Sequence, residues 1–144
     1  MAPTMPAGTL VVVEPVEDAR AEVARGAVVI HEHLGTEPVG APGDRYVKRV
    51  VALEADTLRL RGRTLTVNGA VVAEPYASYA PPPDLAGPLS EGTGDIAGVV
   101  VPAGTVFVLG DNRHNAIDSR YHGPVPYGAI RGRVTDVLSR GEGL

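Results

Sequence analysis

Short apolar runs alternate with turn-forming residues along most of this 144-residue chain. The runs are rich in valine, whose β-branched side chain is favoured in strands. Runs of this kind at close spacing are typical of an all-β sandwich or barrel. We therefore predict a mostly β protein, with strands at residues 10–13, 27–30, 46–52, 58–60, 64–67, 99–101 and 106–109.

The segments between these runs carry three further signals. Asn68 and Gly69 separate two β-type runs, and because both residue types tolerate positive φ, they predict a tight hairpin. Residues 16–25 space alanine, glutamate and arginine in a way that predicts a short amphipathic helix. Residues 79–94 are rich in proline and glycine, and we predict an extended loop there.

Composition narrows the classes of protein that fit. The length suits one domain, or one domain with a large insertion. A formal net charge of -4 argues against a general nucleic-acid-binding protein, and the absence of cysteine excludes disulfides and thiolate metal sites. No apolar run approaches the roughly 20 residues of a membrane span. No signal peptide is visible either, so we expect the chain as given to be soluble.

The most polar stretch follows the last apolar run and reads Gly-Asp-Asn-Arg-His-Asn-Ala-Ile-Asp-Ser-Arg-Tyr-His-Gly, residues 110–123. A turn after a strand favours glycine, aspartate and asparagine, but it does not need so many charged side chains. Carboxylates and guanidinium groups at this spacing can lock a loop through charge-assisted hydrogen bonds. A solvated polar loop and a locked loop both fit the stretch taken alone.

The pattern Gly-Asp-Asn-Arg-x-x-x-x-Asp-Ser-Arg-x-x-Gly resembles the last signature box of the type I signal peptidases, which are membrane-anchored serine endopeptidases with a Ser/Lys dyad. Other boxes of that family are resembled in the same order along the chain. Residues 1–13 resemble its nucleophile box, in which the catalytic serine would be the residue before Met1. Weaker matches lie at residues 25–30, 65–76, 101–108 and 123–134.

The second specific match is Gly43-Asp-Arg-Tyr-Val-Lys-Arg-Val-Val51, which resembles the family's base box and makes Lys48 the general base. A free lysine has a pKa near ~10.4 and must fall to roughly 7–8 to act near neutral pH. Burial among apolar neighbours can lower it. If strand alternation holds, Lys48 shares a face with Tyr46 and Val50, and Arg49 points the other way, solvated or salt-bridged.

The resemblance implies a mostly β fold of antiparallel sheets or a partly open barrel. A catalytic core of residues 1–56 and 101–137 would be interrupted by an inserted β subdomain at residues 57–100, with a tail at residues 138–144. It also implies that the full-length protein is held at the extracytoplasmic face of the cell membrane. No nucleic acid partner and no cofactor are expected.

The implied reaction is removal of signal peptides from exported preproteins. The serine before Met1 would attack the scissile carbonyl, and Lys48 would deprotonate that serine. The substrate would bind as an added strand with small residues near the cut. The expected walls of its pockets are Met1, Met5, Tyr46 and Val47, and the residues expected to hold the loop around the lysine are Asp111, Arg113, Asp118 and Arg120.

Several departures leave alternatives open. Ala116 stands where many family members carry a hydroxyl residue that bonds the lysine, and the 52–56 turn keeps only Asp56 of the usual pattern. Without the serine, the chain as given is expected to be inactive. The alternatives are a non-catalytic binding protein of the same fold, or a related Ser/Lys peptidase of the pilus-processing or self-cleaving repressor type.

The histidines predict no metal site. His31 and His33 share a strand face, but no third ligand lies nearby in the sequence. His114 and His122 are expected on the loop surface. Ser119 has no base spaced for it, and the resemblance implies a structural use.

Overall fold

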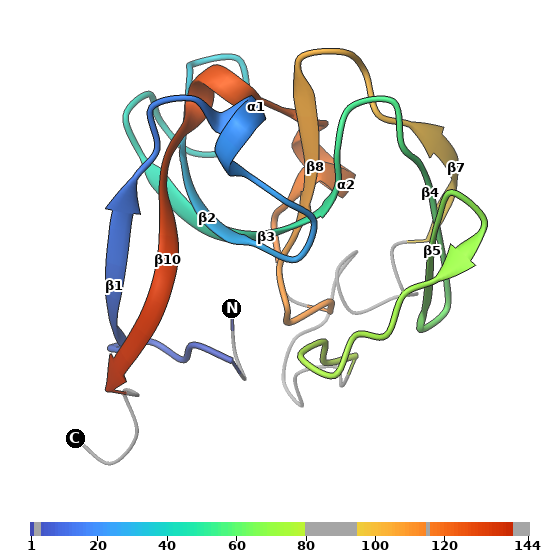
Figure 1. Ribbon diagram of the computed structural model, residues 1–144, viewed down its shortest axis with the longest axis horizontal. Helices are drawn as coiled ribbons and strands as arrows, with labels where there is room; N and C mark the ends of the chain where they lie inside the picture. Colours follow the sequence, from blue (N-terminus) through green and yellow to red (C-terminus); the bar gives the residue numbers. More distant parts are fainter. Residues whose placement is uncertain (2–3, 80–94, 115, 140–144) are drawn as a thin grey trace.

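The computed structural model describes residues 1, 4–79, 95–114 and 116–139, and its strands form two open antiparallel sheets (Figure 1). Of the loop predicted at residues 79–94, residues 80–94 lie outside the described residues. The larger sheet has the order β1 (Leu10–Pro15), β10 (Ile130–Ser139), β2 (Val28–Glu32), β3 (Arg45–Ala52), β8 (Thr105–Leu109), β9 (Val125–Pro126). The smaller sheet has the order β6 (Ala70–Val71), β5 (Thr64–Val67), β4 (Thr57–Arg61), β7 (Ile96–Val100).

Strands β3 and β8 contribute side chains to two separate hydrophobic cores, one on each face. Val50 of β3 packs with Val106 and Val108 of β8 in a core beneath the larger sheet. Val51 on the opposite face packs with Phe107 and the leucines of the smaller sheet. The period of two along a strand produces this division. The face of β3 on which a side chain stands therefore decides which core it meets.

All seven predicted strands are confirmed, with ends that move by up to three residues. The predicted hairpin is also confirmed, since Asn68 and Gly69 adopt φ values of 51° and 82° between β5 and β6. The fold class is likewise confirmed as mostly β with antiparallel sheets.

The sequence pattern missed one long strand and lengthened one helix. β10 is ten residues long, but only Ile130 and Gly132 of it are buried, so it carries no apolar run. The predicted helix at residues 16–25 is reduced to the four residues of α1 (Ala19–Glu22). That helix is capped by Asp18, and the Glu22 carboxylate accepts a 2.6 Å hydrogen bond from the Asp18 amide. Short helices are only marginally stable in water, so the helix does not extend beyond this capped turn.

The turn at residues 53–56, which keeps only Asp56 of the usual pattern, is closed by a hydrogen-bond network around that carboxylate. Ala55 takes a left-handed conformation with φ of 69°. The Asp56 carboxylate accepts hydrogen bonds from the Leu53 amide at 2.8 Å, from Asn68 at 2.9 Å and from Arg25 at 2.7 and 2.8 Å. Hydrogen bonding to Arg25 lowers the pKa of Asp56 to about 2, so this carboxylate stays charged and keeps the turn closed.

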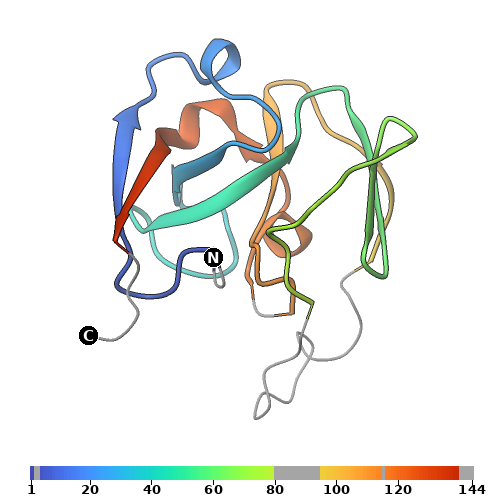
Figure 2. The same ribbon diagram turned by 60° about the horizontal axis from the view of Figure 1, so that its bottom comes forward.

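The first residues of the chain run from the start of β1 back toward the middle of the molecule (Figures 1 and 2). The N-terminus therefore lies near β3 instead of at the outer edge of the larger sheet. The remaining helical elements, α2 (Ser119–His122) and η1 (Tyr127–Ala129), precede β9 and β10 respectively.

Candidate active site

Lys48, the only lysine in the sequence, lies on β3 opposite Val29 of β2. Its ammonium is 3.3 Å from the Val47 carbonyl, and within the described residues this is its one hydrogen bond. Burial lowers the pKa of Lys48, while the carboxylates of Asp118 and Asp111 act in the opposite direction from a distance. The direction of this shift is the one that a lysine base needs.

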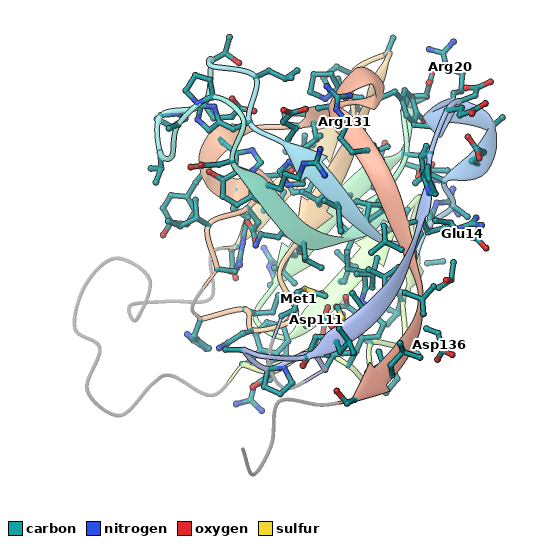
Figure 3. All side chains as sticks on the ribbon, turned by 90° about the vertical axis from the view of Figure 1, so that its left-hand side faces the viewer. Met1, Glu14, Arg20, Asp111, Arg131 and Asp136 are labelled. Atoms are coloured by element: carbon teal, nitrogen blue, oxygen red, sulfur yellow. The ribbon has the colours of Figure 1, made fainter. Side chains whose placement is uncertain are left out.

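Met1 lies beside Lys48. Burial lowers the pKa of the Met1 ammonium, the positive charge of Lys48 lowers it further, and Asp111 acts in the opposite direction. The segment is held in place by two hydrogen bonds, one from the Met5 amide to the Met1 carbonyl at 3.0 Å and one from the Thr4 hydroxyl to Asp111 at 2.6 Å. Met1 and Asp111 are close to each other in Figure 3. The main-chain nitrogen of Met1 is thus fixed in the neighbourhood of the lysine.

A groove of about 440 Å³ runs along β3 from this point. It brings together all four residues predicted to contact substrate, together with Lys48. The lining residues are Met1, Met5, Pro6, Ala7, Gly8, Thr9, Val11, Arg45, Tyr46, Val47 and Lys48.

Arg49, the next residue of β3, is buried and makes contacts on the other face. Its guanidinium donates bidentate hydrogen bonds of 2.9 and 2.8 Å to Asp111 and a third of 2.9 Å to the Gly26 carbonyl. It also lies 3.8 Å from the ring centre of Tyr76. Of the two fates predicted for Arg49, the salt bridge is confirmed and solvation is wrong.

The loop after β8 is closed by the charged residues that the sequence singled out. Arg113 is buried, donates to Glu74 at 2.5 and 3.1 Å and to the Gly110 carbonyl at 2.8 Å, and also reaches the Tyr79 hydroxyl. Asp118 accepts from Arg120 at 2.8 and 2.9 Å and from the Gly110 amide at 3.0 Å. Of the two loop types left open by the sequence, the locked one is present.

The hydroxyl of Ser119 accepts a 2.9 Å hydrogen bond from the Val108 amide and is buried. Ala116 lies against Gly110, where a Cβ atom on residue 110 would come within 2.5 Å of the Ala116 methyl. Ala116 also faces the same cavity as Lys48, so no side-chain hydroxyl is offered to the lysine from this position.

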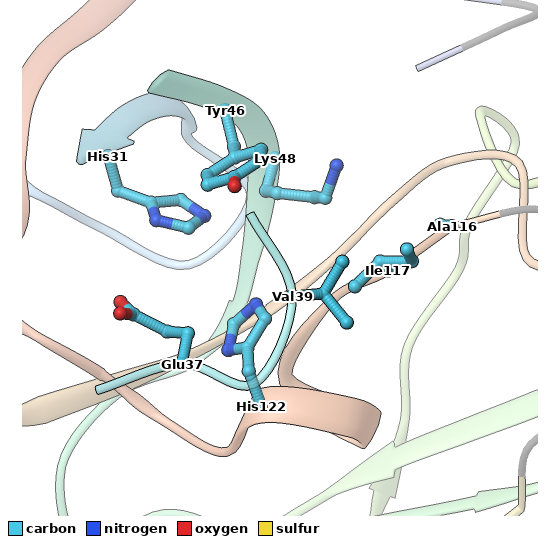
Figure 4. A pocket seen from close by; sticks show the side chains of 8 residues that line it. All are labelled: His31, Glu37, Val39, Tyr46, Lys48, Ala116, Ile117 and His122. Atoms are coloured by element: carbon cyan, nitrogen blue, oxygen red, sulfur yellow. The ribbon is translucent and has the colours of Figure 1, made fainter. Parts of the chain in front are cut away.

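A second cavity of about 280 Å³ lies next to Lys48 (Figure 4). The sequence placed His122 on the loop surface, which is wrong, because the ring is half-buried and faces His31 with a centroid distance of 5.8 Å. His114 is half-buried too, and its ring meets the edge of Tyr79. His31 and His33 lie on one face as predicted, and both are buried with their rings near Tyr46. In the described part of the chain no three potential ligands are grouped to hold a metal ion.

The residues missed at the sequence level are the partners of the recognised ones. Thr4 donates a hydrogen bond to Asp111, and Glu74 pairs with Arg113. The only available signal was that forked guanidinium donors and carboxylates tend to pair.

The family profile described as "Signal peptidase, peptidase S26" matches residues 1–138. The chain belongs to this family of signal peptidases. Signal peptidase I of Bacillus caldolyticus is 34% identical over 140 residues, covering 93% of this chain and 71% of that protein. A probable signal peptidase I-2 of Synechocystis is 31% identical over 134 residues, covering 93% and 56%.

A solved structure agrees with the family assignment. A signal peptidase I from Enterococcus faecalis superposes with a TM-score of 0.60 at 29% identity, covering 79% of this chain and 97% of that chain. The chain spans between 40% and 58% of the length of four curated Bacillus and Synechocystis relatives. Among the described residues, no helix is both long enough and apolar enough to cross a membrane.

Proposed function

We propose that this chain is the catalytic region of a Ser/Lys endopeptidase that removes signal peptides from exported preproteins. The observation that carries the proposal is the placement of Met1 and Lys48 at one end of a groove along β3. Any residue joined to the Met1 nitrogen comes next to the only lysine, and the pKa of that lysine is lowered by burial. Relatives named signal peptidase I support the same activity.

The nucleophile is a serine immediately before Met1. Its hydroxyl oxygen attacks the scissile carbonyl carbon while Lys48 takes the hydroxyl proton. Lys48 then gives this proton to the leaving amine as the carbon–nitrogen bond breaks. A water molecule then attacks the acyl-enzyme while Lys48 takes its proton, and Lys48 returns that proton to the serine oxygen as the ester carbon–oxygen bond breaks. Because no carboxylate is hydrogen-bonded to Lys48 among the described residues, its neutral form is accessible for the two steps in which it takes up a proton.

The substrate binds in the groove as an extended strand beside β3. Met1, Met5, Tyr46 and Val47 form walls that admit only small side chains before the cut. Asp111, Arg113, Asp118 and Arg120 support the loop that faces the lysine. Residues 1–56 and 101–137 form the catalytic core, residues 57–100 are an insertion, and residues 138–144 are a tail. The whole protein works at the extracytoplasmic face of the cell membrane and needs no nucleic acid.

The test adds one residue before Met1. A chain preceded by serine should cleave a peptide that carries a signal-peptide cut site, and a chain preceded by alanine should not. Lys48→Met in the serine-preceded chain should abolish cleavage, whereas Arg61→Met, which removes an exposed cation from β4 of the smaller sheet, should retain it. Equal cleavage with serine and with alanine would refute the proposed nucleophile, and no cleavage with either would refute the activity.

One observation favours a second candidate function. Ala116 offers Lys48 no hydroxyl, so the groove could bind exported peptides without cutting them. In that case the peptide would bind equally well to the serine-preceded and alanine-preceded chains and would remain intact with both.

A further inference from the structure

The cavity beside Lys48 is separate from the substrate groove but shares a boundary with it. We call it the histidine pocket. Tyr46 and Lys48 line both spaces, so the histidine pocket adjoins the groove at the lysine. Figure 4 shows the rings of His31 and His122 and the carboxylate of Glu37 around one space. Its lining residues are His31, Glu37, Val39, Tyr46, Lys48, Ala116, Ile117 and His122.

One buried polar side chain of this pocket, that of His31, has no hydrogen-bond partner among the described residues. His31 is 2% exposed, yet neither of its ring nitrogens has a hydrogen-bond partner among the described residues. Burial, with the nearby charges of His122 and Lys48, lowers the pKa of His31 to about 4, so the ring is neutral near pH 7. Burial also lowers the pKa of His122. A neutral imidazole offers one donor and one acceptor, and those of His31 are left unsatisfied.

Glu37 supplies the formal charge of the pocket. Burial raises the pKa of Glu37, but hydrogen bonds from backbone amides, including those of Leu34 and Thr36, outweigh burial and lower it. The carboxylate is therefore charged near neutral pH. When Lys48 is neutral, as it must be to accept a proton, the pocket as a whole is negative.

The path of a peptide places its residues on both sides of Lys48. The lysine must reach both the serine hydroxyl and the leaving amine, and that amine belongs to the first residue after the cut. An extended strand rises roughly 3.3 Å per residue, so the next one or two residues pass directly beyond the lysine. With residues before the cut in the groove, the space that adjoins Lys48 and lies outside the groove is the histidine pocket.

We propose that the histidine pocket receives the side chain of the first or second residue after the cut, and that it favours a cationic or amide side chain over a carboxylate. This inference rests on the proposed peptidase function. The apolar mouth at Val39 and Ile117 contacts the stem of a long side chain, while Glu37 and the histidines meet its polar end. The mature part of the substrate thereby influences how fast its signal peptide is removed.

The experiment compares peptides that differ only at these two positions, carrying lysine, alanine or glutamate, with the serine-preceded chain. The lysine peptide should have a kcat/KM about tenfold above that of the glutamate peptide, the size expected for attraction in one case and repulsion in the other at a partly exposed site. Glu37→Gln should reduce this ratio to about twofold. Glu32→Gln, which removes a carboxylate from β2 outside the pocket, should leave the ratio and the activity unchanged.

A second variant guards against misfolding of the Glu37 loop. Ile117 is 42% exposed at the mouth, so Ile117→Lys adds a cation without disturbing the core, and it should shift the preference toward the glutamate peptide. Cleavage of all three peptides at equal rates, or a ratio that both variants leave unchanged, would overturn this inference alone. Cleavage of none would overturn the proposed function and this inference with it.

Discussion

Lys48 and Arg49 are neighbouring cations on opposite faces of β3, and their surroundings differ. Arg49 is buried with a carboxylate, a backbone carbonyl and an aromatic ring, so each side of its guanidinium is compensated. Lys48 has one backbone carbonyl at 3.3 Å and faces neutral imidazoles. A compensated buried charge contributes to structure, whereas an uncompensated one has a lowered pKa and is available for chemistry. Burial alone therefore does not make a cationic side chain a base, because the side chain must also lack a close partner for its charge.

The largest expected effect comes from breaking the compensated face. Asp111→Ala leaves the Arg49 guanidinium buried without its partner and removes the acceptor of Thr4. The free energy of unfolding should fall by about 3–5 kcal/mol, measured by chemical denaturation. Glu32→Ala is the control, because it removes an exposed ion pair with Arg131 and should cost less than about 1 kcal/mol. Equal losses in the two variants would contradict the account of this face.

On the face of β3 that carries Lys48, we expect the buried His31 to make the free energy of unfolding depend on pH. His31 has a folded pKa of about 4 and an ordinary value of 6.5, so the unfolded chain binds more protons between these values. Stability must then rise with pH across this window, by about 3 kcal/mol from His31 itself. The measurement subtracts the unfolding free energy of His31→Phe from that of the parent chain between pH 4 and 7. If the difference in unfolding free energy between the two chains does not change with pH, His31 is not held neutral by burial, His122 and Lys48.

Lys48→Met removes an uncompensated charge while keeping an unbranched side chain. Its free energy of unfolding at pH 7 should exceed that of the parent chain by about 1 kcal/mol, the cost of burying a poorly paired polar group. The gain should shrink as pH rises from the lowered folded pKa toward the ordinary 10.5, since the parent lysine then loses its charge. Arg45→Met on the exposed end of β3 should stay within about 0.5 kcal/mol. A loss of stability in Lys48→Met would mean that the lysine is compensated after all.

The smallest expected effect comes from giving Lys48 a partner. Ala116→Ser introduces a hydroxyl into the wall of the same cavity, and that oxygen can accept a hydrogen bond from the ammonium. The charged form is then favoured, so the pKa of Lys48 should rise toward its ordinary value, while the free energy of unfolding changes by less than about 1 kcal/mol. An unchanged Lys48 pKa would show that residue 116 does not reach the lysine.

Local patterns were sufficient for most of the fold. Valine-rich runs and the Asn68–Gly69 turn are encoded within a few residues, and those elements were predicted correctly. β10 was not predicted, because its place depends on pairing with β1 and β2, for example Gly132 with Pro15 and with Ile30. Such pairing leaves no periodic signal in a strand whose far half is exposed on both faces.

The site residues, too, were predicted where the signal is local and missed where it depends on distant contacts. Motif order identified Lys48 and the groove residues, but the partners that hold them are distant in sequence. Thr4 meets Asp111 across 107 positions, and Arg49 meets it across 62. His122 was taken for a surface residue because nothing near it in the sequence indicates that α2 turns its ring toward His31. Tertiary contacts of this kind override the local polarity from which surface positions are predicted.

The most direct test is the pKa of Lys48 itself. Because the sequence holds a single lysine, uniform incorporation of ¹³C-labelled lysine places one side-chain ε resonance in the NMR spectrum, and its pH titration reports this group alone. We expect a midpoint clearly below the ordinary value of 10.5, because the lysine is buried without a close carboxylate. A midpoint at or above 10.5 would mean that the lysine is solvated or paired, and it would contradict the role of Lys48 as the base of the dyad.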